Sequence, residues 1–249
     1  MQHFGSLNLW TSSAGAGGGG GGPYAVNAVT FDGTNDYLTH TSAIMGDSKQ
    51  LTAYIEFRMD TVKQQWIFNC SDTDTAGQHR FEITLDSGIL LRGKNAAGTD
   101  ILEVQGDNIT DTDWHILHIS IDTASGVQMY LDNVDTIAST AILTDDTLEL
   151  SGGGSPKHYV GSREGGGSKL DGDLGRVWIK SGTAIDFTDA DNRALFDPSV
   201  DFGASGIVAG VTPEIYFEGD EATYASNKGS GAGFTEVGDL TNAATSPSG

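Results

Sequence analysis

"WHILHISIDTASGVQMYLDNV", residues 114–134, is the stretch that decides the fold. A strand would place alternate residues of its first half on opposite faces, with His115, Leu117 and Ile119 against Ile116, His118 and Ser120. The inward set of the second half is Val127, Met129 and Leu131. A period of two over runs of this length predicts two strands, with a turn of small and polar residues between them.

The same alternation recurs along the chain from Tyr24 onward. Residues 51–59 would place one apolar set on a single face: Leu51, Ala53, Ile55, Phe57 and Met59. Turn residues follow at intervals of about ten, a spacing typical of antiparallel sandwiches and barrels. We therefore predict an all-β antiparallel sandwich. The one helix expected is "TDADNRALFD", residues 188–197, capped by Thr188 with Leu195 and Phe196 packed inward.

Composition excludes several classes of partner. The 249 residues include 13 Lys and Arg against 34 Asp and Glu, which gives a net charge of −21. Such acidity argues against nucleic acid and against an anionic membrane surface. No apolar run approaches the ~18 residues of a membrane span. The N-terminus lacks the pattern of a secretory signal, so we expect synthesis in a cytoplasm. The single cysteine, Cys70, is predicted to be a buried apolar side chain.

The chain divides into three predicted parts: 1–22, 23–197 and 198–249. Residues 1–22 end in six consecutive glycines, which suit a flexible tether. Alternatively they form an arm that anchors on a partner through Phe4, Leu7, Leu9 and Trp10. Residues 198–249 are expected to complete the sandwich, because "EIYFE" and "FTEV" could not form a core alone.

Three stretches together resemble a known family: residues 29–39, "VTFDGTNDYLT", residues 114–134, and residues 159–182, "YVGSREGGGSKLDGDLGRVWIKSG". In this order they resemble the laminin-G-like, concanavalin A-like lectin/glucanase family over residues 24–197. The resemblance implies a jelly-roll sandwich of two large, curved antiparallel sheets.

Other stretches resemble laminin-G-type proteins of tailed phages and prophages. They are "TFDGTNDYLT", "NAAGTDIL", "NKGSGAGFT" and the "TNAATSPSG" end. This resemblance implies a non-enzymatic virion structural protein, either a capsid decoration or a head/tail-associated module. Such a protein would be made in the host cytoplasm, act in the virion and bind other virion proteins, as a homo-oligomer. The alternative function is a carbohydrate-binding adhesin that recognises host surface glycan.

The loop in "FDGTNDY" offers oxygen ligands from Asp32, Asn35 and Asp36, which makes calcium the candidate cofactor. Alternatively, the two carboxylates build the turn through hydrogen bonds to the backbone, with Gly33 at positive φ. Phe31 and Tyr37 would then point to the core.

Catalysis has weaker candidates. "EIYFE" would place Glu214, Tyr216 and Glu218 on one strand face, but Tyr216 stands where the resembling glucanases carry an Asp. We therefore expect no catalytic residue, and we expect His115 to be structural. The large rings available for sugar stacking are Trp10, Tyr54, Trp66, Trp178 and Tyr224.

Overall fold

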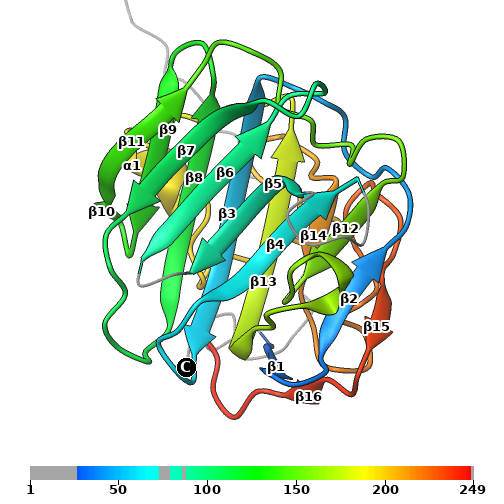
Figure 1. Cartoon of the computed structure of the whole chain (residues 1–249). Helices are drawn as coiled ribbons and strands as arrows, with labels where there is room; N and C mark the ends of the chain where they lie inside the picture. Colours follow the sequence, from blue (N-terminus) through cyan, green and yellow to red (C-terminus); the bar gives the residue numbers. More distant parts are fainter. Residues whose placement is uncertain (1–26, 73–78, 86–87, 248–249) are drawn as a thin grey trace, which may run out of the picture.

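Two antiparallel sheets pack face to face and form a sandwich, as Figure 1 shows. The structure is a computed structural model that describes residues 27–72, 79–85 and 88–247. The predicted all-β sandwich with one short α-helix is confirmed for these residues. The helical elements are the 3-10 helix η1 (Glu164–Gly166) and α1 (Ala190–Ala194).

Sheet A has the strand order β10-β9-β8-β3-β13-β1-β16, and β14 also pairs with β13. The quoted hairpin supplies its β8 and β9, which pair in register from Leu117 opposite Leu131 to Asp122 opposite Gly126. The strands of sheet A are β1 (Val29–Asp32), β3 (Gln50–Met59), β8 (His115–Asp122), β9 (Gly126–Leu131), β10 (Val134–Asp135), β13 (Asp171–Ser181), β14 (Ile215–Phe217) and β16 (Thr241–Asn242).

Sheet B has the strand order β11-β7-β6-β5-β4-β12-β2-β15. Its strands are β2 (Tyr37–His40), β4 (Gln65–Ser71), β5 (His79–Leu85), β6 (Ile89–Lys94), β7 (Asp100–Gly106), β11 (Ile137–Leu143), β12 (Lys157–Val160) and β15 (Thr235–Val237). Residues after 198 therefore contribute strands to both sheets, since β14 and β16 lie in sheet A and β15 in sheet B.

The main core fills the space between the two sheets. The predicted inward set of β3 is confirmed, because each of its members is at most 2% exposed: Leu51, Ala53, Ile55, Phe57 and Met59. Cys70 is a free, fully buried thiol in the same core, and burial raises its pKa. Apolar burial of this kind is the main stabilising contribution to a sandwich.

A second core covers the outer face of sheet A. Tyr54 of β3, Trp178 of β13 and Tyr216 of β14 are fully buried there. The segment 185–211, which includes α1, supplies the covering side chains: Ile185, Phe187, Phe196, Phe202 and Val208, with Val200 and Val211 partly buried against them. Outward positions of these strands are therefore buried as well, which alternation alone does not indicate.

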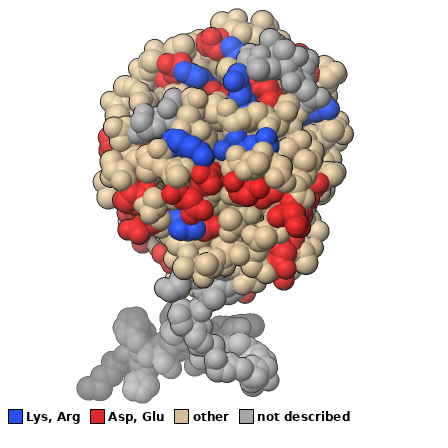
Figure 2. Space-filling model, turned by 60° about the horizontal axis from the view of Figure 1, so that its bottom comes forward, with Lys and Arg blue, Asp and Glu red and all other residues tan. Residues whose placement is uncertain are grey.

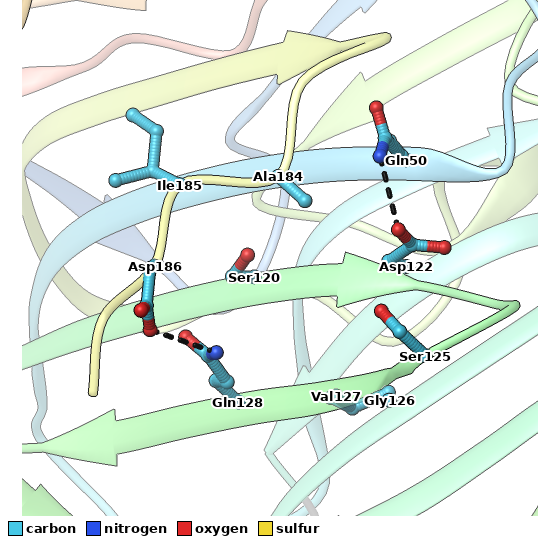
Figure 3. A pocket seen from close by; sticks show the side chains of 10 residues that line it. All are labelled: Gln50, Ser120, Asp122, Ser125, Gly126, Val127, Gln128, Ala184, Ile185 and Asp186. Carbon is cyan, nitrogen blue, oxygen red and sulfur yellow. Dashed lines mark hydrogen bonds between the residues drawn. The ribbon is translucent and has the colours of Figure 1, made fainter.

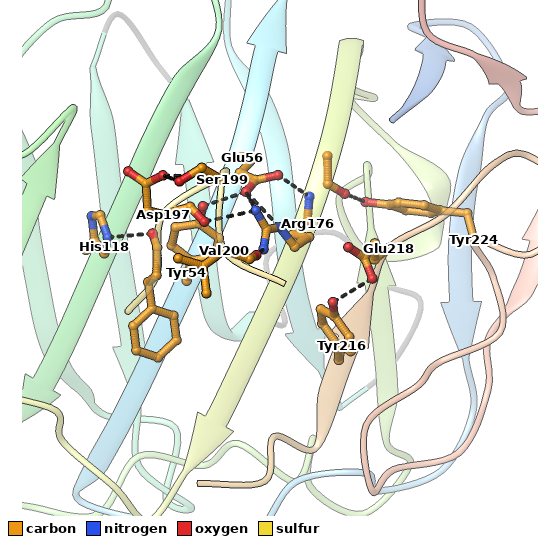
Figure 4. A network of polar contacts seen from close by, with 12 residues as sticks. Tyr54, Glu56, His118, Arg176, Asp197, Ser199, Val200, Tyr216, Glu218 and Tyr224 are labelled. Atoms are coloured by element: carbon orange, nitrogen blue, oxygen red, sulfur yellow. Dashed lines mark hydrogen bonds and ion pairs between the residues drawn. The ribbon is translucent and has the colours of Figure 1, made fainter. Parts of the chain in front are cut away.

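A fully buried ion pair lies under this second core, as Figure 4 shows. The Arg176 guanidinium donates to Glu56 Oε1 at 2.9 Å from Nε, and the Arg176 backbone N–H donates to Glu56 Oε2 at 2.9 Å. Tyr54 donates its hydroxyl to Glu56 Oε1 at 2.5 Å. Burial raises the pKa of the Glu56 carboxyl, and the Arg176 charge opposes this shift.

Arg176 also fastens the covering segment to the sheet. Its Nη1 donates to the Val200 carbonyl at 2.7 Å and its Nη2 to the Asp197 carbonyl at 3.2 Å. Its guanidinium stacks 4.0 Å from the centre of the Phe202 ring. One arginine thus joins β13, β3 and the segment that closes the second core.

The helix differs from its prediction in cap and packing. Asp189, rather than Thr188, is the N-cap, and its carboxylate accepts from the Asp191 N–H at 2.9 Å. Phe196 is buried as expected, but Leu195 is 42% exposed. The helix ends one turn earlier than predicted, so Leu195 is turned towards solvent. No helix among the described residues is long and apolar enough to cross a membrane.

Replacing Glu56 by Gln should lower the free energy of unfolding by about 3–5 kcal/mol, because the Arg176 charge stays buried without its counter-ion. Equilibrium unfolding in urea measures this loss. Lys49→Met is the control, since the Lys49–Asp145 pair is exposed and should contribute less than about 1 kcal/mol. Equal effects of the two substitutions would contradict the prediction.

Candidate functional site

A row of outward-facing side chains crosses sheet B from β7 to β15. Each residue of the row is the direct pairing partner of the next. Because paired residues of antiparallel strands face the same side, these side chains lie together on the outer face of the sheet. The row, called the polar row below, runs Glu103, Arg92, Glu82, Asn69, Tyr159, Thr39 and Thr235.

Ion pairs hold one half of the polar row in place. Arg92 lies 3.3 Å from the Glu103 carboxylate and 3.6 Å from the Glu82 carboxylate. Glu82 also accepts a hydrogen bond from the Trp66 indole at 2.9 Å. The guanidinium of Arg163, next to η1, lies 5.6 Å from the centre of the Trp66 ring. This half of the face is a preorganised polar surface.

Asn69 occupies the centre of the polar row, between Glu82 and Tyr159. Its side chain is fully buried, and neither its Nδ2 nor its Oδ1 has a hydrogen-bond partner among the described residues. The hydroxyls of Thr84 and Ser162 are also buried without a partner. An unsatisfied buried polar group costs about 1–3 kcal/mol. The centre of this face is therefore poorly optimised for stability, as functional surfaces often are.

A hollow of about 300 Å³ opens at the other half of the polar row. We call it the tyrosine hollow, and its lining residues are Tyr37, Thr39, Thr41, Lys157, Tyr159 and Gly165. The rings of Tyr37 and Tyr159 have their centroids 6.2 Å apart at an angle of 48°. Lys169 Nζ lies 5.9 Å from the Tyr37 ring centre. The partly exposed ring of Tyr37, hydroxyl groups and an ammonium group thus lie together at one concave spot, with the ring of Tyr159 buried beside them, and no carboxylate lines it.

Some basic side chains lie in a group on the surface although the chain is strongly acidic. Figure 2 shows Lys and Arg side chains lying in a group, with Asp and Glu concentrated beside them. Two lysines also lie at the tyrosine hollow, since Lys157 lines it and Lys169 lies beside it. A local field of this kind can attract an anion even to a protein with a net charge of −21.

The loop proposed for calcium is organised around backbone N–H groups. Asp32 Oδ1 accepts from the N–H groups of Thr34, Asn35 and Asp36 at 2.7, 2.9 and 3.3 Å. Asp36 accepts from the N–H groups of Asp32 and Asp239 at 3.1 and 2.9 Å. Gly33 has φ +68°. The hydrogen bonds from Asn35 and its neighbours lower the pKa of Asp32.

Backbone N–H donors thus contact Asp32 Oδ1 and both carboxylate oxygens of Asp36. No group of three His, Cys, Asp or Glu side chains among the described residues could hold a metal ion. The loop therefore has the hydrogen bonds and the positive φ at Gly33 that the turn requires. Calcium binding by Asp32, Asn35 and Asp36 stays a prediction. The expectation that Tyr37 points to the core is wrong, because Tyr37 lies on the outer face of sheet B. Phe31 is fully buried, as expected.

The carboxylates of "EIYFE" are bound to other groups. Glu214 pairs with Lys180, and its Oε2 accepts from the Ser181 N–H at 2.9 Å. Tyr216 donates its hydroxyl to Glu218 Oε2 at 2.7 Å (Figure 4). Nothing in this arrangement indicates a pair of carboxylates poised across a glycosidic bond.

His115 lies in a clamp at the hairpin. Its Nδ1 is 2.8 Å from the Asp132 carboxylate and its Nε2 is 3.0 Å from the Asp111 carboxylate. The hydrogen bond with Asp132 raises the pKa of His115. These contacts join β8 to the two neighbouring loops, which is a structural role.

The large rings considered for sugar stacking that lie within the described residues are buried. Tyr54, Trp178 and Tyr224 are fully buried, and Trp66 is 5% exposed. Trp10 lies outside the described residues, as do the other proposed anchors, Phe4, Leu7 and Leu9. The sequence alone does not predict the tyrosine hollow, because Tyr37 and Tyr159 are far apart in the chain. In the sequence, each tyrosine has a polar residue two positions away on its strand. Such a residue lies on the same strand face, which indicates that the face is turned outward.

The fold and sequence place the chain in a family. The sequence profile of the concanavalin A-like lectin/glucanases superfamily (Laminin_G_3) matches residues 32–184. This is more than half of the chain, so the protein belongs to that superfamily. The predicted resemblance is thus confirmed at the level of the superfamily. Curated proteins show no match to this chain.

Solved structures share the fold at low sequence identity. A "putative carbohydrate binding protein" from Bacteroides ovatus has a TM-score of 0.60 and 11% identity, with 90% of this chain and 61% of that chain covered. The SAP-like pentraxin of Limulus polyphemus has a TM-score of 0.49 and 14% identity, covering 69% and 82%. Domains LG4-5 of the mouse laminin alpha1 chain have a TM-score of 0.45 and 15% identity, covering 66% and 43%. At these identities the likeness concerns the fold alone.

The His115 clamp predicts a pH-dependent stability. Its folded-state pKa is raised, so its contribution is fully present below the ordinary value of 6.5 and is lost as the pH rises through the folded-state pKa. His115→Gln should therefore destabilise more at pH 5.5 than at pH 9, by up to about 1 kcal/mol. Urea unfolding at the two pH values measures the difference.

Two other histidines change the stability of the fold with pH in the opposite direction. Burial lowers the pKa of His118 and of His158 to about 4, so between pH 6.5 and about 4 the unfolded state binds more protons than the folded state, and stability falls as the pH falls through this range. Both are present in the wild type and in His115→Gln, so they cancel in the comparison. An equal loss at both pH values would contradict the role of the clamp.

Proposed function

We propose that the protein is a non-catalytic saccharide-binding module whose ligand occupies the tyrosine hollow and extends along the polar row. The observation that carries the proposal is the concave part of sheet B where the partly exposed ring of Tyr37 lies with Thr39 and Lys157, beside the buried ring of Tyr159. Ring faces stack on the apolar C–H surface of a sugar, and polar groups at the rim orient its hydroxyls.

Charge narrows the class of saccharide. Lys157 lines the hollow, Lys169 lies beside it, and no Asp or Glu contributes to its wall. A neutral or acidic saccharide therefore suits the hollow, whereas a cationic sugar would meet two like charges. The hollow has room for one or two sugar rings, because 300 Å³ lies at the small end of known ligand pockets.

The carbohydrate-binding name of the Bacteroides ovatus protein supports this proposal as an analogy of fold. Its TM-score of 0.60 over 90% of this chain means that the same two sheets are present in both proteins. The residues of the tyrosine hollow supply the independent part of the argument.

A glycan-array screen of the whole chain tests the proposal, run once with calcium and once with EDTA. We expect binding of neutral or acidic saccharides in at least one arm. Tyr37→Ala should weaken the best hit about tenfold or more, because a stacking face is lost. Tyr130→Ala is the matched control, since Tyr130 is a half-buried tyrosine of sheet A that packs against Arg193 at 4.4 Å. No binding in either arm, or equal loss in both variants, would overturn the proposal.

A finer proposal concerns where the module acts. The resemblance to tailed-phage proteins supports a role in the virion, as a capsid decoration or a head/tail-associated homo-oligomer, with the saccharide site used as a host-facing adhesin. Phe4, Leu7, Leu9 and Trp10 would then anchor the module to other virion proteins.

Removal of residues 1–22 tests this finer proposal. The truncated protein should keep its thermal melting temperature and its saccharide binding, because the described sandwich lies outside residues 1–22. It should lose incorporation into particles, which co-sedimentation with the virion measures. Normal incorporation of the truncated protein would contradict the anchoring role.

A further inference from the structure

Three polar side chains at the centre of sheet B are buried without a hydrogen-bond partner among the described residues. Asn69 lacks one at both Nδ2 and Oδ1, and the hydroxyls of Thr84 and Ser162 lack one as well. Thr84 is directly opposite Trp66 on the neighbouring strand, Asn69 is the next outward residue of β4, and Ser162 follows β12 on the other side of β4. We call these three residues the unpaired cluster. Buried polar groups are nearly always paired, so a cluster without partners points to a missing ligand.

A pocket on sheet A shows the ordinary arrangement. It lies where β3 begins and the β8–β9 hairpin turns, with the segment 184–186 as its third wall (Figure 3). Gln50 donates to the Asp122 carboxylate at 3.0 Å. Gln128 donates to the Asp186 carboxylate, also at 3.0 Å. The protein itself thus supplies partners for both carboxylates of that pocket, whereas the described residues supply none for the unpaired cluster.

A short segment, residues 163–168, lies against this part of sheet B, and we call it the flap. It contains η1, which contacts β4 and β12. The Arg163 guanidinium lies 5.6 Å from the centre of the Trp66 ring, and the Glu164 side chain is fully buried. The outward-facing side chains of Trp66 and Asn69 are accordingly only 5% and 0% exposed. A ligand reaches the unpaired cluster only if its cover moves.

The flap is built so that it can move as a unit. The Arg163 N–H donates to the Gly167 carbonyl at 2.8 Å, and the Gly166 N–H donates to the Arg163 carbonyl at 3.1 Å. These hydrogen bonds close within the flap. Just beyond it, the Leu170 N–H donates to the Gly161 carbonyl at 2.8 Å, which closes the base of the loop. The flap can therefore tilt away from the sheet while its own hydrogen bonds and those of the strands persist.

The flap also forms a wall of the tyrosine hollow. Gly165 lines the hollow, and a Cβ added at Gly166 would lie 3.1 Å from the Tyr37 ring. Both glycines have positive φ, +68° and +71°, which other residues adopt only with strain. A ligand in the hollow therefore touches the flap, so that binding in the hollow is coupled to the position of the flap.

The groups beneath the flap suit a saccharide. An asparagine side chain offers a donor and an acceptor side by side, which match two adjacent hydroxyls of a sugar. The Trp66 ring offers a face for stacking, and the hydroxyls of Thr84 and Ser162 add further donors and acceptors. Because these hydrogen bonds form only when the flap is open, they supply the differential affinity that shifts the flap towards the open state.

We propose that the flap lifts when a saccharide enters the tyrosine hollow, and that the uncovered Asn69 side chain then binds two adjacent hydroxyls of this ligand. The inference rests on the proposed saccharide function and adds to it the contact that selects the ligand and the movement that exposes this contact. The closed form keeps polar groups without partners because the open, ligand-bound form supplies the partners.

Thiol labelling of the whole chain carrying Asn69→Cys tests whether the flap lifts. The wild type is the control, because its single thiol, Cys70, is the next residue of β4 and faces the main core. We expect a maleimide to label position 69 of the variant at least about a hundredfold faster than Cys70, because local opening is more frequent than unfolding of the core. Labelling of position 69 as slow as that of Cys70, measured by mass spectrometry, would overturn the proposal.

A second substitution tests whether the flap is the cover. Gly166→Ala, added to Asn69→Cys, should speed the labelling at least about fivefold, because alanine at φ +71° strains the closed flap and its Cβ meets the Tyr37 ring. Gly182→Ala is the matched control, since Gly182 has φ +74° and open space around it in the turn after β13. An unchanged rate in Gly166→Ala, or the same increase in both variants, would overturn the proposal.

The glycan array tests the contact itself. Asn69→Leu should weaken the array hits about tenfold or more without lowering the melting temperature, because the amide removed has no partner in the closed form. Thr84→Val should raise the melting temperature by about 3 °C for the same reason. Thr52→Val is the matched control and should lower it, since the equally buried Thr52 hydroxyl donates to the Thr183 carbonyl at 2.9 Å. Equal falls in both threonine variants would overturn the proposal.

The array also separates this proposal from the proposed function. Silence of the array with the wild type would overturn the proposed saccharide function. Hits that are lost in Tyr37→Ala but persist unchanged in Asn69→Leu would overturn the role of Asn69 alone and leave the saccharide function standing.

Discussion

The buried pair of Glu56 and Arg176 is the interaction on which the arrangement of the two outer faces depends. Two charges removed from water require excellent geometry, and each remaining donor of the guanidinium must find an acceptor. Here the acceptors are the Glu56 carboxylate and the carbonyls of Asp197 and Val200. The pair therefore holds one particular segment, residues 185–211, over sheet A.

The two faces that result have opposite chemistry. The tyrosine hollow on sheet B combines rings with lysine, and a pocket at the edge of the second core combines Asp122 and Asp186 with the amides of Gln50 and Gln128. This second pocket exists because the segment 184–186 crosses the sheet on its way to α1. The same covering segment thus buries the aromatic rings of sheet A and creates a polar pocket where the covering begins.

The sequence predicts the sandwich well because a period of two is a local property. The inward sets of β3 and of the β8–β9 hairpin follow from alternation, and the burial of Cys70 follows from its neighbours. The second core could not be predicted in this way, because Tyr54 and Trp178 are covered by residues distant in sequence. The tyrosine hollow depends on the pairing of β2 with β12, and the pocket at Asp122 and Asp186 depends on a crossing segment. Alternation identifies which residues share a strand face, whereas a site requires knowledge of which strands are neighbours.

Strand β1 has a consequence for how the chain folds during synthesis. Val29 pairs with Leu174 on one side and with Asn242 on the other, so both partners of the first described strand are made long after it. At the usual rates of translation, β1 waits on the order of ten seconds or more for β13. Contacts so remote in sequence make folding slow, because a large loop must close before they form. The sandwich therefore closes late, and the emerging chain carries an unpaired apolar strand through most of its own translation, a period in which chaperones and misfolding compete for it.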